Sequence, residues 1–503
     1  METQTENSGI VYRFLNAIEK AGNKMLDPIT IFFLLCVAVV LISGVLGFFG
    51  VTAIHPKDGS IVKAVSLLQR GELQRYLSTI ISSFQGFPPM AMVLVVMIGV
   101  GVSEKSGLMD AALHRAVSNV PKFIVTPVII FLGLVSNVAG DAGFIVLPPL
   151  SALVFLSLGR HPLIGLFASF AGVAAGFCAN IMIGLSDVLA AGFTVPAAQM
   201  IDPTYMATPA MNYYFIFVST FVLTIVGTIV TEKIVAPRFE NEVFAKAKAE
   251  SLAPSELSKK ALKWAGISFI AYLALIVILC LGSSPFLGDD KGSILGINAP
   301  LMKGTIPIIT VMFLLPGLVY GKIAGTIKKD SDAIKMMGKS MSEMGTYIVL
   351  AFFAAQFLAL FSYSNMGVIL AIKGANLLTT IGFTGPSLIV SFIVFASFIN
   401  LFIGSASAKW AIMAPVFVPM FLLLGYDPAL TQMAYRIGDS VTNPLSPLFP
   451  YLPIILTYIQ VYKKDSGLGT VVSNMLPYSL VFFIVWTIMF IIWIMLGIPL
   501  GPK

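Results

Sequence analysis

Residues 397–443 read SFINLFIGSASAKWAIMAPVFVPMFLLLGYDPALTQMAYRIGDSVTN, a long apolar run interrupted by groups that a lipid-facing helix excludes. Each unpaired polar group in hydrocarbon costs several kcal/mol, and a charge at mid-depth costs at least ~2.5–3.5 kcal/mol. The interrupting charges, Lys409, Arg436 and Asp439, must therefore face protein, water or cargo. Such a cluster is typical of a substrate or ion pathway through a membrane.

The composition of the whole chain places this stretch in a membrane protein. Of the 503 residues, 57% are hydrophobic and 11% are charged, whereas a soluble domain has about 25% charged residues. The apolar runs are continuous over about 20 residues, the length of a transmembrane helix, and lack the alternation of a β-barrel strand. The net charge of +7 lies mainly in loops between these runs, which fits the positive-inside rule and argues against nucleic-acid binding. We therefore expect one all-α polytopic membrane domain, 1–503, in the lipid bilayer.

Basic segments predict how the chain is threaded. Arg13, Lys20 and Lys24 precede the first apolar run, which is too long for a signal-peptide core, so we expect a first span with a cytoplasmic N-terminus. Residues 232–263 carry seven Lys or Arg against five Glu and predict a cytoplasmic loop. Alternation then leaves the C-terminus on the periplasmic or extracellular side of a bacterial inner membrane. We expect nine spans, at about 28–50, 88–103, 162–209, 211–231, 264–282, 305–321, 343–361, 428–461 and 474–498.

Two further apolar regions are each interrupted by small and polar residues. Residues 123–158 are split by SNVAGDAG at 136–143, and residues 386–425 are split at 400–409. The two arms of the first region, about 14 residues each, fall short of a ~30 Å hydrocarbon core at ~1.5 Å per residue. We therefore predict two re-entrant hairpins that enter and leave on one side.

Each hairpin is followed by an overlong span with polar residues in its middle, the pattern of a broken helix. The span 162–209 carries Asn180 and Asp187, and the span 428–461 is expected to break at 438–444. Hairpin and broken span together occupy about 123–209 in the first half of the chain and about 386–461 in the second.

These two units repeat one another. The tip residue Asn137 corresponds to Asn400, and each is followed 43 positions later by another asparagine, Asn180 or Asn443. Because the units begin on opposite sides of the membrane, they form an inverted-topology repeat, in which discontinuous helices hold ions and cargo at mid-membrane. Beyond the tips, a shift of 266 positions places Pro149 on Pro415, Pro162 on Pro428 and Gly172 on Gly438.

The tip asparagines are candidate ion ligands. Asn137 and Asn400 sit beside small residues that permit tight turns, and their amide oxygens suit a hard cation such as Na+. The alternative is that each asparagine only caps the end of a half-helix.

Carboxylates in the broken spans are candidates for sodium or proton coupling. Burial raises the pKa of a carboxyl group and a nearby cation lowers it, so Asp187 and Asp439 are suited to either ion. Arg436 lies three positions before Asp439, close enough for an ion pair on one helical turn. Its guanidinium also suits bidentate capture of a substrate carboxylate. The alternative is a structural salt bridge that closes the helix break.

Three other residues each allow two interpretations of their role. Trp410 lies at mid-depth, outside the interfacial belt where Trp is usual, and either stacks on an aromatic substrate or packs on a neighbouring span. Asp141 is either an ion ligand or an acceptor that stabilises the first tip. Lys409 either attracts an anion or pairs with an aspartate.

Several classes of protein lack support. The histidines His55, His114 and His161 fall in expected loops, and no metalloprotease, nucleophile-elbow or Walker motif occurs, which disfavours an intramembrane hydrolase and an ATP-driven pump. An ion channel is a further alternative, distinguished by flux without an organic cargo. The three cysteines show neither a disulfide framework nor a zinc spacing.

The chain resembles the p-aminobenzoyl-glutamate transporter (AbgT) family, within the wider group of ion transporters built from inverted hairpin repeats. The resemblance covers nearly the whole chain. Its motifs are SNVAGDAG at 136–143, AGFCAN at 175–180 with Asp187, GSASAKW at 404–410, YRIGDSVTN at 435–443, LPY at 476–478 and GIPLGP at 497–502. One departure is Val188, where the family often has proline, which leaves the local backbone break at Asp187 open.

The resemblance implies a homodimer whose subunits hold cargo between the hairpin tips. When the functional roles known for the family are carried to matching positions, the resemblance implies roles in transport for five residues: Asp187, Trp410, Pro428, Arg436 and Asp439. It also implies that Asn137 and Asn400 lie near a sodium site. We accordingly expect a transporter without enzymatic activity or cofactor. It would be coupled to Na+ or H+ and would move a small anionic aromatic such as p-aminobenzoyl-glutamate.

Direction stays open, because uptake of this folate breakdown product and export of sulfonamide antimetabolites both resemble family behaviour. The expected substrate-binding residues are Trp410, Arg436, Asp187, Asp439, Pro428, Asn180 and Asn443. The expected ion-binding residues are Asn137, Asn400, Asp141, Asp187 and Asp439.

Overall fold

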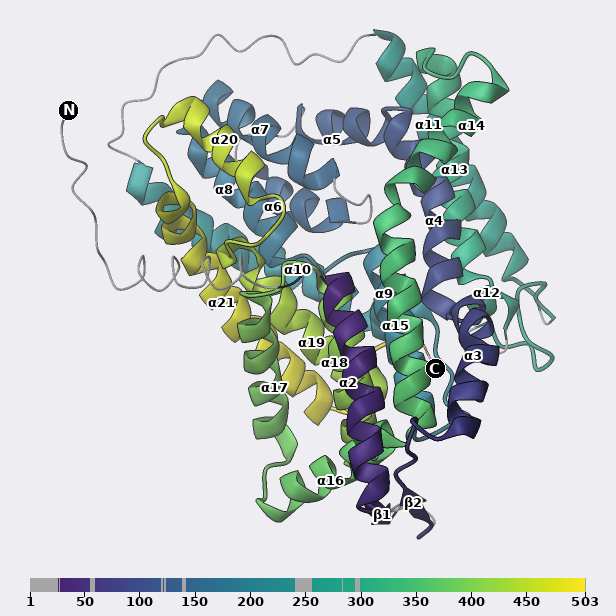
Figure 1. Ribbon diagram of the computed structural model, residues 1–503. Helices are drawn as coiled ribbons and strands as arrows, with labels where there is room; N and C mark the ends of the chain where they lie inside the picture. The colour runs from purple at the N-terminus through teal and green to yellow at the C-terminus, as the bar shows by residue number, and fades with distance from the viewer. Residues whose placement is uncertain are drawn as a thin grey trace, which may run out of the picture.

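The computed structural model of the chain is helical almost throughout (Figure 1). It describes residues 28–54, 59–118, 124–137, 142–239, 256–282, 284–294 and 299–502, together with residues 26 and 121. Within these residues the only sheet is a two-stranded antiparallel hairpin of β1 (Thr52–Ile54) and β2 (Ile61–Lys63).

Eight helices among the described residues are long and apolar enough to cross a membrane. One of them, α18, is an arm of the second hairpin, and the other seven match the expected continuous spans. The helices outside the two repeat units are α2 (Pro28–Phe48), α3 (Arg70–Gln85), α4 (Pro88–Lys105), α5 (Leu108–Ser118), η4 (Pro209–Asn212), α10 (Tyr213–Val230), η5 (Thr231–Val235), η6 (Ala236–Phe239), α11 (Glu256–Leu279), α12 (Pro300–Lys303), α13 (Thr305–Ala324), α14 (Asp330–Glu343), α15 (Gly345–Tyr363), α16 (Met366–Thr380) and α21 (Leu468–Met495).

The first repeat unit has the predicted hairpin and broken helix. Its elements are α6 (Val125–Ser136), α7 (Ala142–Ser157), α8 (Pro162–Phe170), η3 (Ala171–Ala175) and α9 (Leu185–Gln199). A proline at the first helical position starts α8, where the missing N–H costs nothing. The chain leaves helical geometry after Ala175 and resumes it at Leu185, where the Asp187 carboxylate accepts the N–H of Gly184 at 2.7 Å. The helix break is therefore fixed by its own aspartate.

The second repeat unit has the same order of elements. They are α17 (Gly385–Asn400), α18 (Ala406–Leu423), α19 (Pro428–Thr442), η7 (Asn443–Leu445) and α20 (Leu452–Tyr462). The expected break at 438–444 is wrong by several residues, because Gly438 and Asp439 remain inside α19. The interruption instead begins at Asn443 and lasts to α20, since Pro444, Pro447 and Pro450 remove the backbone donors that a continuous helix needs.

The expected loop 232–263 is also shorter than predicted. Helical structure continues from α10 through η5 and η6 to Phe239, and α11 begins at Glu256. Glu232 accounts for the extension, because its carboxylate binds Arg160 at 2.8 Å and accepts a hydrogen bond from Thr126 at 2.5 Å. Residues 240–255 lie outside the described residues. The segment between α15 and the second hairpin contains the helix α16.

The two units make the same internal contacts. A Cβ at Gly172 would lie 2.6 Å from the carbonyl oxygen of Ile130, and a Cβ at Gly438 would lie 2.5 Å from that of Ile393. Both glycines therefore let a broken helix press against the first arm of its hairpin. The expected fold class, an all-α membrane protein with two re-entrant hairpins and an inverted repeat, is confirmed.

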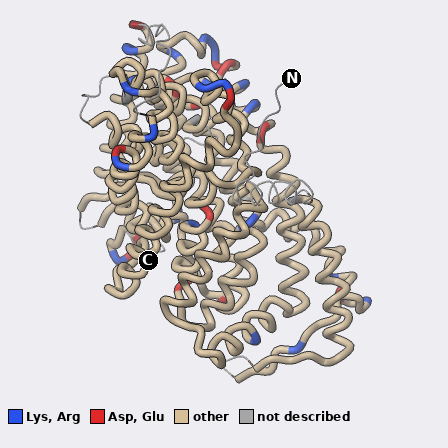
Figure 2. Tube along the Cα trace, turned by 90° about the vertical axis from the view of Figure 1, so that its left-hand side faces the viewer, with Lys and Arg blue, Asp and Glu red and all other residues tan. Residues whose placement is uncertain are grey.

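Figure 1 agrees with the inversion: α6, α7 and α8 of the first unit lie toward the upper end of the molecule, whereas α17 of the second unit lies toward the lower end. Figure 2 shows that most Lys, Arg, Asp and Glu positions gather at the upper end of the molecule, while the lower half has only a few. The charged residues inside the helical body are therefore exceptions that require explanation.

Candidate functional site

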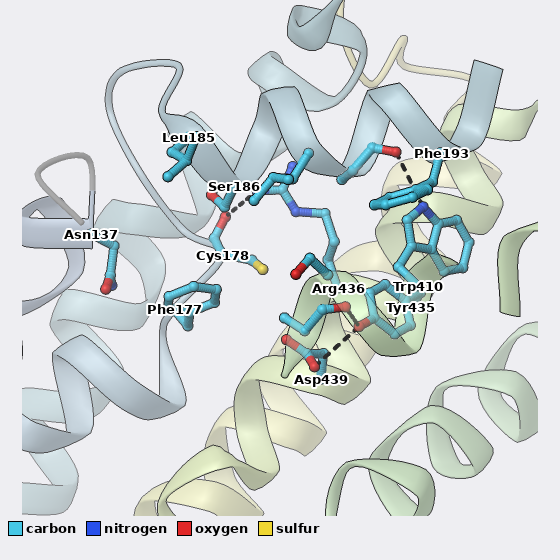
Figure 3. Close-up of a pocket in the computed structure, with 14 residues that line it drawn as sticks. Asn137, Phe177, Cys178, Leu185, Ser186, Phe193, Trp410, Tyr435, Arg436 and Asp439 are labelled. Atoms are coloured by element: carbon cyan, nitrogen blue, oxygen red, sulfur yellow. Dashed lines mark hydrogen bonds between the residues drawn. The ribbon is translucent and has the colours of Figure 1, made fainter. Parts of the chain in front are cut away.

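A cavity of about 220 Å³ lies where the two repeat units meet (Figure 3). The break after η3 and the helix α9 form one wall, and α18 and α19 form the other. Its lining residues are Asn137, Phe177, Cys178, Leu185, Ser186, Leu189, Ala190, Phe193, Ala406, Ser407, Trp410, Tyr435, Arg436 and Asp439. Four of the sequence-predicted site residues, Asn137, Trp410, Arg436 and Asp439, thus face one space.

Arg436 joins the two units by a buried ion pair. Its Nη1 donates to Asp187 Oδ1 at 2.7 Å, and both side chains are 2% exposed. Its Nη2 reaches the carbonyl oxygen of Cys178 at 3.5 Å, and its Nε has no partner among the described residues. The guanidinium is held on one side and keeps a donor for a further acceptor.

The expected ion pair between Arg436 and Asp439 is wrong, because Asp439 pairs with a lysine instead. Lys409 Nζ lies 2.5 Å from Asp439 Oδ1, and both side chains are fully buried. Tyr435 also donates to Asp439 Oδ1 at 3.2 Å, while Asp439 Oδ2 has no partner in the described part of the chain. Of the two readings of Lys409, the structure selects the pair with an aspartate.

The second hairpin tip is closed by Asn400. Its Nδ2 donates to the carbonyl oxygen of Asp439 at 2.6 Å and to Asn443 Oδ1 at 2.9 Å, and its Oδ1 contacts Lys409 Nζ. Asn443 in turn donates to the carbonyl oxygen of Ala174, so the second break is tied to the first.

The first hairpin tip has the same backbone contact, and its described residues add no ion pair. Asn137 Nδ2 donates to the carbonyl oxygen of Val173 at 3.0 Å, the residue that the 266-position shift places on Asp439. Asn137 Oδ1 is buried and has no partner among the described residues. The other tip candidate, Asp141, lies outside the described residues.

The aromatic wall of the cavity is a stacked pair. The rings of Trp410 and Tyr435 are 4.5 Å apart at 22°, and Tyr435 donates to the carbonyl oxygen of Ala406 at 2.6 Å. Trp410 Nε1 donates to Thr194 Oγ1 at 2.9 Å. Trp410 therefore both packs on its neighbours and lines the cavity, so its two readings are compatible.

A buried chain of hydrogen bonds continues from Trp410 through residues that sequence reasoning missed. Thr194 donates to Gln432 Oε1 at 2.6 Å, Gln432 donates to Asn212 Oδ1 at 2.6 Å, and Asn212 donates to the carbonyl oxygen of Ala429 at 2.8 Å. The sequence did contain a signal for Thr194, Gln432 and Asn212, because each is a polar residue within an expected membrane span.

Four expected substrate residues are absent from the cavity lining: Asp187 and Asn443, whose contacts are given above, and Asn180 and Pro428. Asn180 accepts the N–H groups of Ile181 and Met182 and so stabilises the first break. Pro428 is buried at the first position of α19, next to the capping Asp427. Both residues shape the backbone of the site and do not face the cavity.

The two tips differ in how well they fit a sodium ion. Sodium requires oxygen ligands, and Asn137 Oδ1 is a buried oxygen with no partner in the described part of the chain. At the second tip, the ammonium of Lys409 contacts the corresponding oxygen of Asn400. Within the described ranges, no group of three or more His, Cys, Asp or Glu residues is placed to hold another metal.

Two inverted units with broken helices and a charged cavity at their meeting point define a membrane transport protein. Comparison with known families agrees, because the model of the AbgT putative transporter family matches residues 13–503. The chain belongs to the AbgT putative transporter family, whose members are transport proteins and not enzymes.

Individual relatives cover nearly the whole chain. The p-aminobenzoyl-glutamate transport protein of Escherichia coli K12 is 36% identical over 499 residues, which are 99% of this chain and 97% of that protein. The crystal structure of the YdaH transporter of Alcanivorax borkumensis covers 94% of this chain and 100% of its own, with 39% identity and a TM-score of 0.91. Neisseria gonorrhoeae MtrF, described with a class of antimetabolite efflux pumps, covers 98% and 100%, with 41% identity and a TM-score of 0.91.

Proposed function

We propose that the chain is a secondary active transporter of p-aminobenzoyl-glutamate or a related small anionic aromatic, driven by a gradient of Na+ or H+. The E. coli relative named for this cargo supports the proposal. So does the inverted repeat, which suits transporters that expose one site alternately to each side.

The observation that carries the proposal is the pairing of an aromatic wall with an incompletely bonded guanidinium in one cavity. Trp410 and Tyr435 offer ring surface, and stacking on such rings is worth ~0.5–1.5 kcal/mol beyond the buried area. Arg436 lines the same cavity with its Nε free of partners among the described residues. An arginine favours a carboxylate over a neutral group, so the two features together select an anionic aromatic.

The size of the cavity suggests that cargo is admitted by a movement of the walls. Its volume of about 220 Å³ is below the ~300–1,000 Å³ that is common for ligand pockets. We propose that α18 and α19 move relative to α9 when cargo binds. The Arg436–Asp187 pair, which bridges α9 and α19, would lengthen or exchange partners in that movement.

A second candidate is the efflux of antimetabolites such as sulfonamides, driven by the proton motive force. MtrF, with 41% identity, is described with a class of antimetabolite efflux pumps. Uptake and efflux use the same cavity, so the two candidates differ in direction and in the physiological cargo.

We further propose a bacterial inner-membrane location with the charge-rich upper end of Figure 2 in the cytoplasm, because cytoplasmic loops carry an excess of Lys and Arg. The N-terminus would then lie in the cytoplasm and the C-terminus outside. The homodimer implied by the family resemblance is part of the same proposal, and the mass of the detergent-purified protein tests it.

The decisive experiment is transport into proteoliposomes. Radiolabelled p-aminobenzoyl-glutamate is supplied under a sodium gradient, a proton gradient or neither, with the protein inserted in a known orientation. We expect saturable accumulation under one of the ion gradients, and Arg436→Lys as a matched variant should lower it at least tenfold, because an ammonium lacks the planar fork. Ion flux without organic cargo would instead indicate a channel.

A further inference from the structure

The second hairpin tip contains a positive charge of its own. Lys409 Nζ lies 2.5 Å from Asp439 Oδ1 and also contacts Asn400 Oδ1. All three side chains are buried. Two oxygens that a sodium ion would need at this tip, Asn400 Oδ1 and Asp439 Oδ1, are therefore already bonded to an ammonium.

The first tip has no counterpart of this ion pair. The 266-position shift that superposes the repeats places Lys409 on Gly143 and Asp439 on Val173. A Cβ at Gly143 would lie 2.2 Å from Ser136 Oγ, so a side chain there would displace Ser136. Both members of the pair are thus present in one repeat and absent from the other, as expected if they act together.

We propose that the Lys409 ammonium is the resident cation of the second tip, so that this tip binds no free sodium ion. A sodium ion placed at Asn400 Oδ1 would lie beside a fixed positive charge and would compete for the same carboxylate. The tip asparagine Asn400 then positions Lys409, and Asn137 Oδ1 is the tip oxygen that a free cation can still reach.

This assignment deepens the proposed cation coupling and rests on it for its physiological meaning. It also predicts a latent site. Without the ammonium, Asn400 Oδ1 and the Asp439 carboxylate would become available, and Asp439 Oδ2 already lacks a partner among the described residues. A neutral residue at position 409 should therefore convert the second tip into a sodium site.

The test is equilibrium binding of 22Na+ to the purified full-length protein, with choline chloride holding the ionic strength constant. We expect any sodium bound by the wild type to disappear in Asn137→Ala. Lys409→Gln should bind one additional sodium ion per chain, and Lys409→Gln/Asn400→Ala should lose it. Lys409→Arg is the matched control, because it keeps the charge and should gain no ion.

Two outcomes would overturn the assignment. One is wild-type sodium binding that survives Asn137→Ala but is lost in Asn400→Ala. The other is a folded Lys409→Gln protein, with a monodisperse elution profile, that binds no more sodium than the wild type. If Lys409→Gln fails to fold, the comparison of Asn137→Ala with Asn400→Ala still decides. No cargo is present, so failure to transport p-aminobenzoyl-glutamate would contradict only the proposed function.

Discussion

The two hairpin tips share a backbone design and differ in charge. In each, an asparagine donates to the carbonyl oxygen of the broken helix, Asn137 to Val173 at 3.0 Å and Asn400 to Asp439 at 2.6 Å. The first tip adds no ionisable side chain among its described residues, whereas the second adds Lys409. The repeat therefore preserves main-chain geometry, which the fold needs twice, and has diverged in the side chains at the tips.

Among the changes that test the difference between the two tips, removal of Lys409 should have the largest effect on stability. Lys409→Met leaves Asp439 as a buried, uncompensated carboxylate, so we expect a loss of ~3–5 kcal/mol in the free energy of unfolding. The measurement is chemical denaturation in detergent, followed by intrinsic fluorescence.

The second tip can also be made to resemble the first. Lys409→Met/Asp439→Val removes both charges and installs the residue type of Val173, so its loss should be smaller than the sum of the two single losses by ~0.5–3 kcal/mol. Additive losses would mean that the two residues do not stabilise one another.

Alanine at the equivalent glycines should have the next largest effect. Gly172→Ala would place a methyl group 2.6 Å from the carbonyl oxygen of Ile130, and Gly438→Ala would place one 2.5 Å from that of Ile393. We expect each substitution to lower the free energy of unfolding by ~1–3 kcal/mol. The control is Gly266→Ala in α11, where a Cβ meets nothing within 4 Å and the change should be neutral or stabilising by up to ~1 kcal/mol. A loss of stability at only one of the two glycines would show that the contacts of Gly172 and Gly438 are not equivalent.

The aromatic wall offers a smaller, cargo-specific effect. Trp410→Ala should weaken the binding of p-aminobenzoyl-glutamate about two- to tenfold more than that of an aliphatic dipeptide, because ring stacking contributes ~0.5–1.5 kcal/mol. Isothermal titration of both ligands measures the difference. Trp410→Phe keeps a ring and should retain most of the preference; equal losses for both ligands would remove stacking from the explanation.

The smallest effect is expected at a carboxylate near the surface, Asp332, which serves as the contrast to buried Asp439. Backbone N–H groups of Lys329 and Lys328 lower the pKa of Asp332 at the start of α14. The contribution of Asp332 to folding stability is therefore complete above its ordinary pKa of about 3.9. It is lost as the pH falls through the lower pKa that this carboxyl has in the folded protein. Asp332→Asn at neutral pH should speed amide exchange in the first turn of α14 and leave cargo binding unchanged.

Much of the architecture follows from local signals. Short apolar arms predicted the first hairpin, because the length of a membrane-spanning helix is set by the thickness of the hydrocarbon. The end of α19 was misplaced, because Gly438 is a weak breaker inside a packed helix, whereas the prolines from Pro444 onward remove donors.

The partners within the site were not predictable from spacing. Arg436 lies three positions from Asp439 but pairs with Asp187, 249 positions away, and only the tertiary fold brings them together. Asp439 is instead matched by Lys409 on the neighbouring helix α18. Sequence identified the polar residues of the pathway, but the choice among oppositely charged partners depends on the packing of α9, α18 and α19.

Among the described residues, the acidic and basic side chains beside the cavity form two pairs, Asp187 with Arg436 and Asp439 with Lys409. When both pairs are ionised, their charges sum to zero. Carrying one uncompensated charge through a potential of ~100 mV requires ~2.3 kcal/mol, so the empty site could change its exposure without electrical work. Any voltage sensitivity of the cycle would then report on the travelling ions and cargo alone.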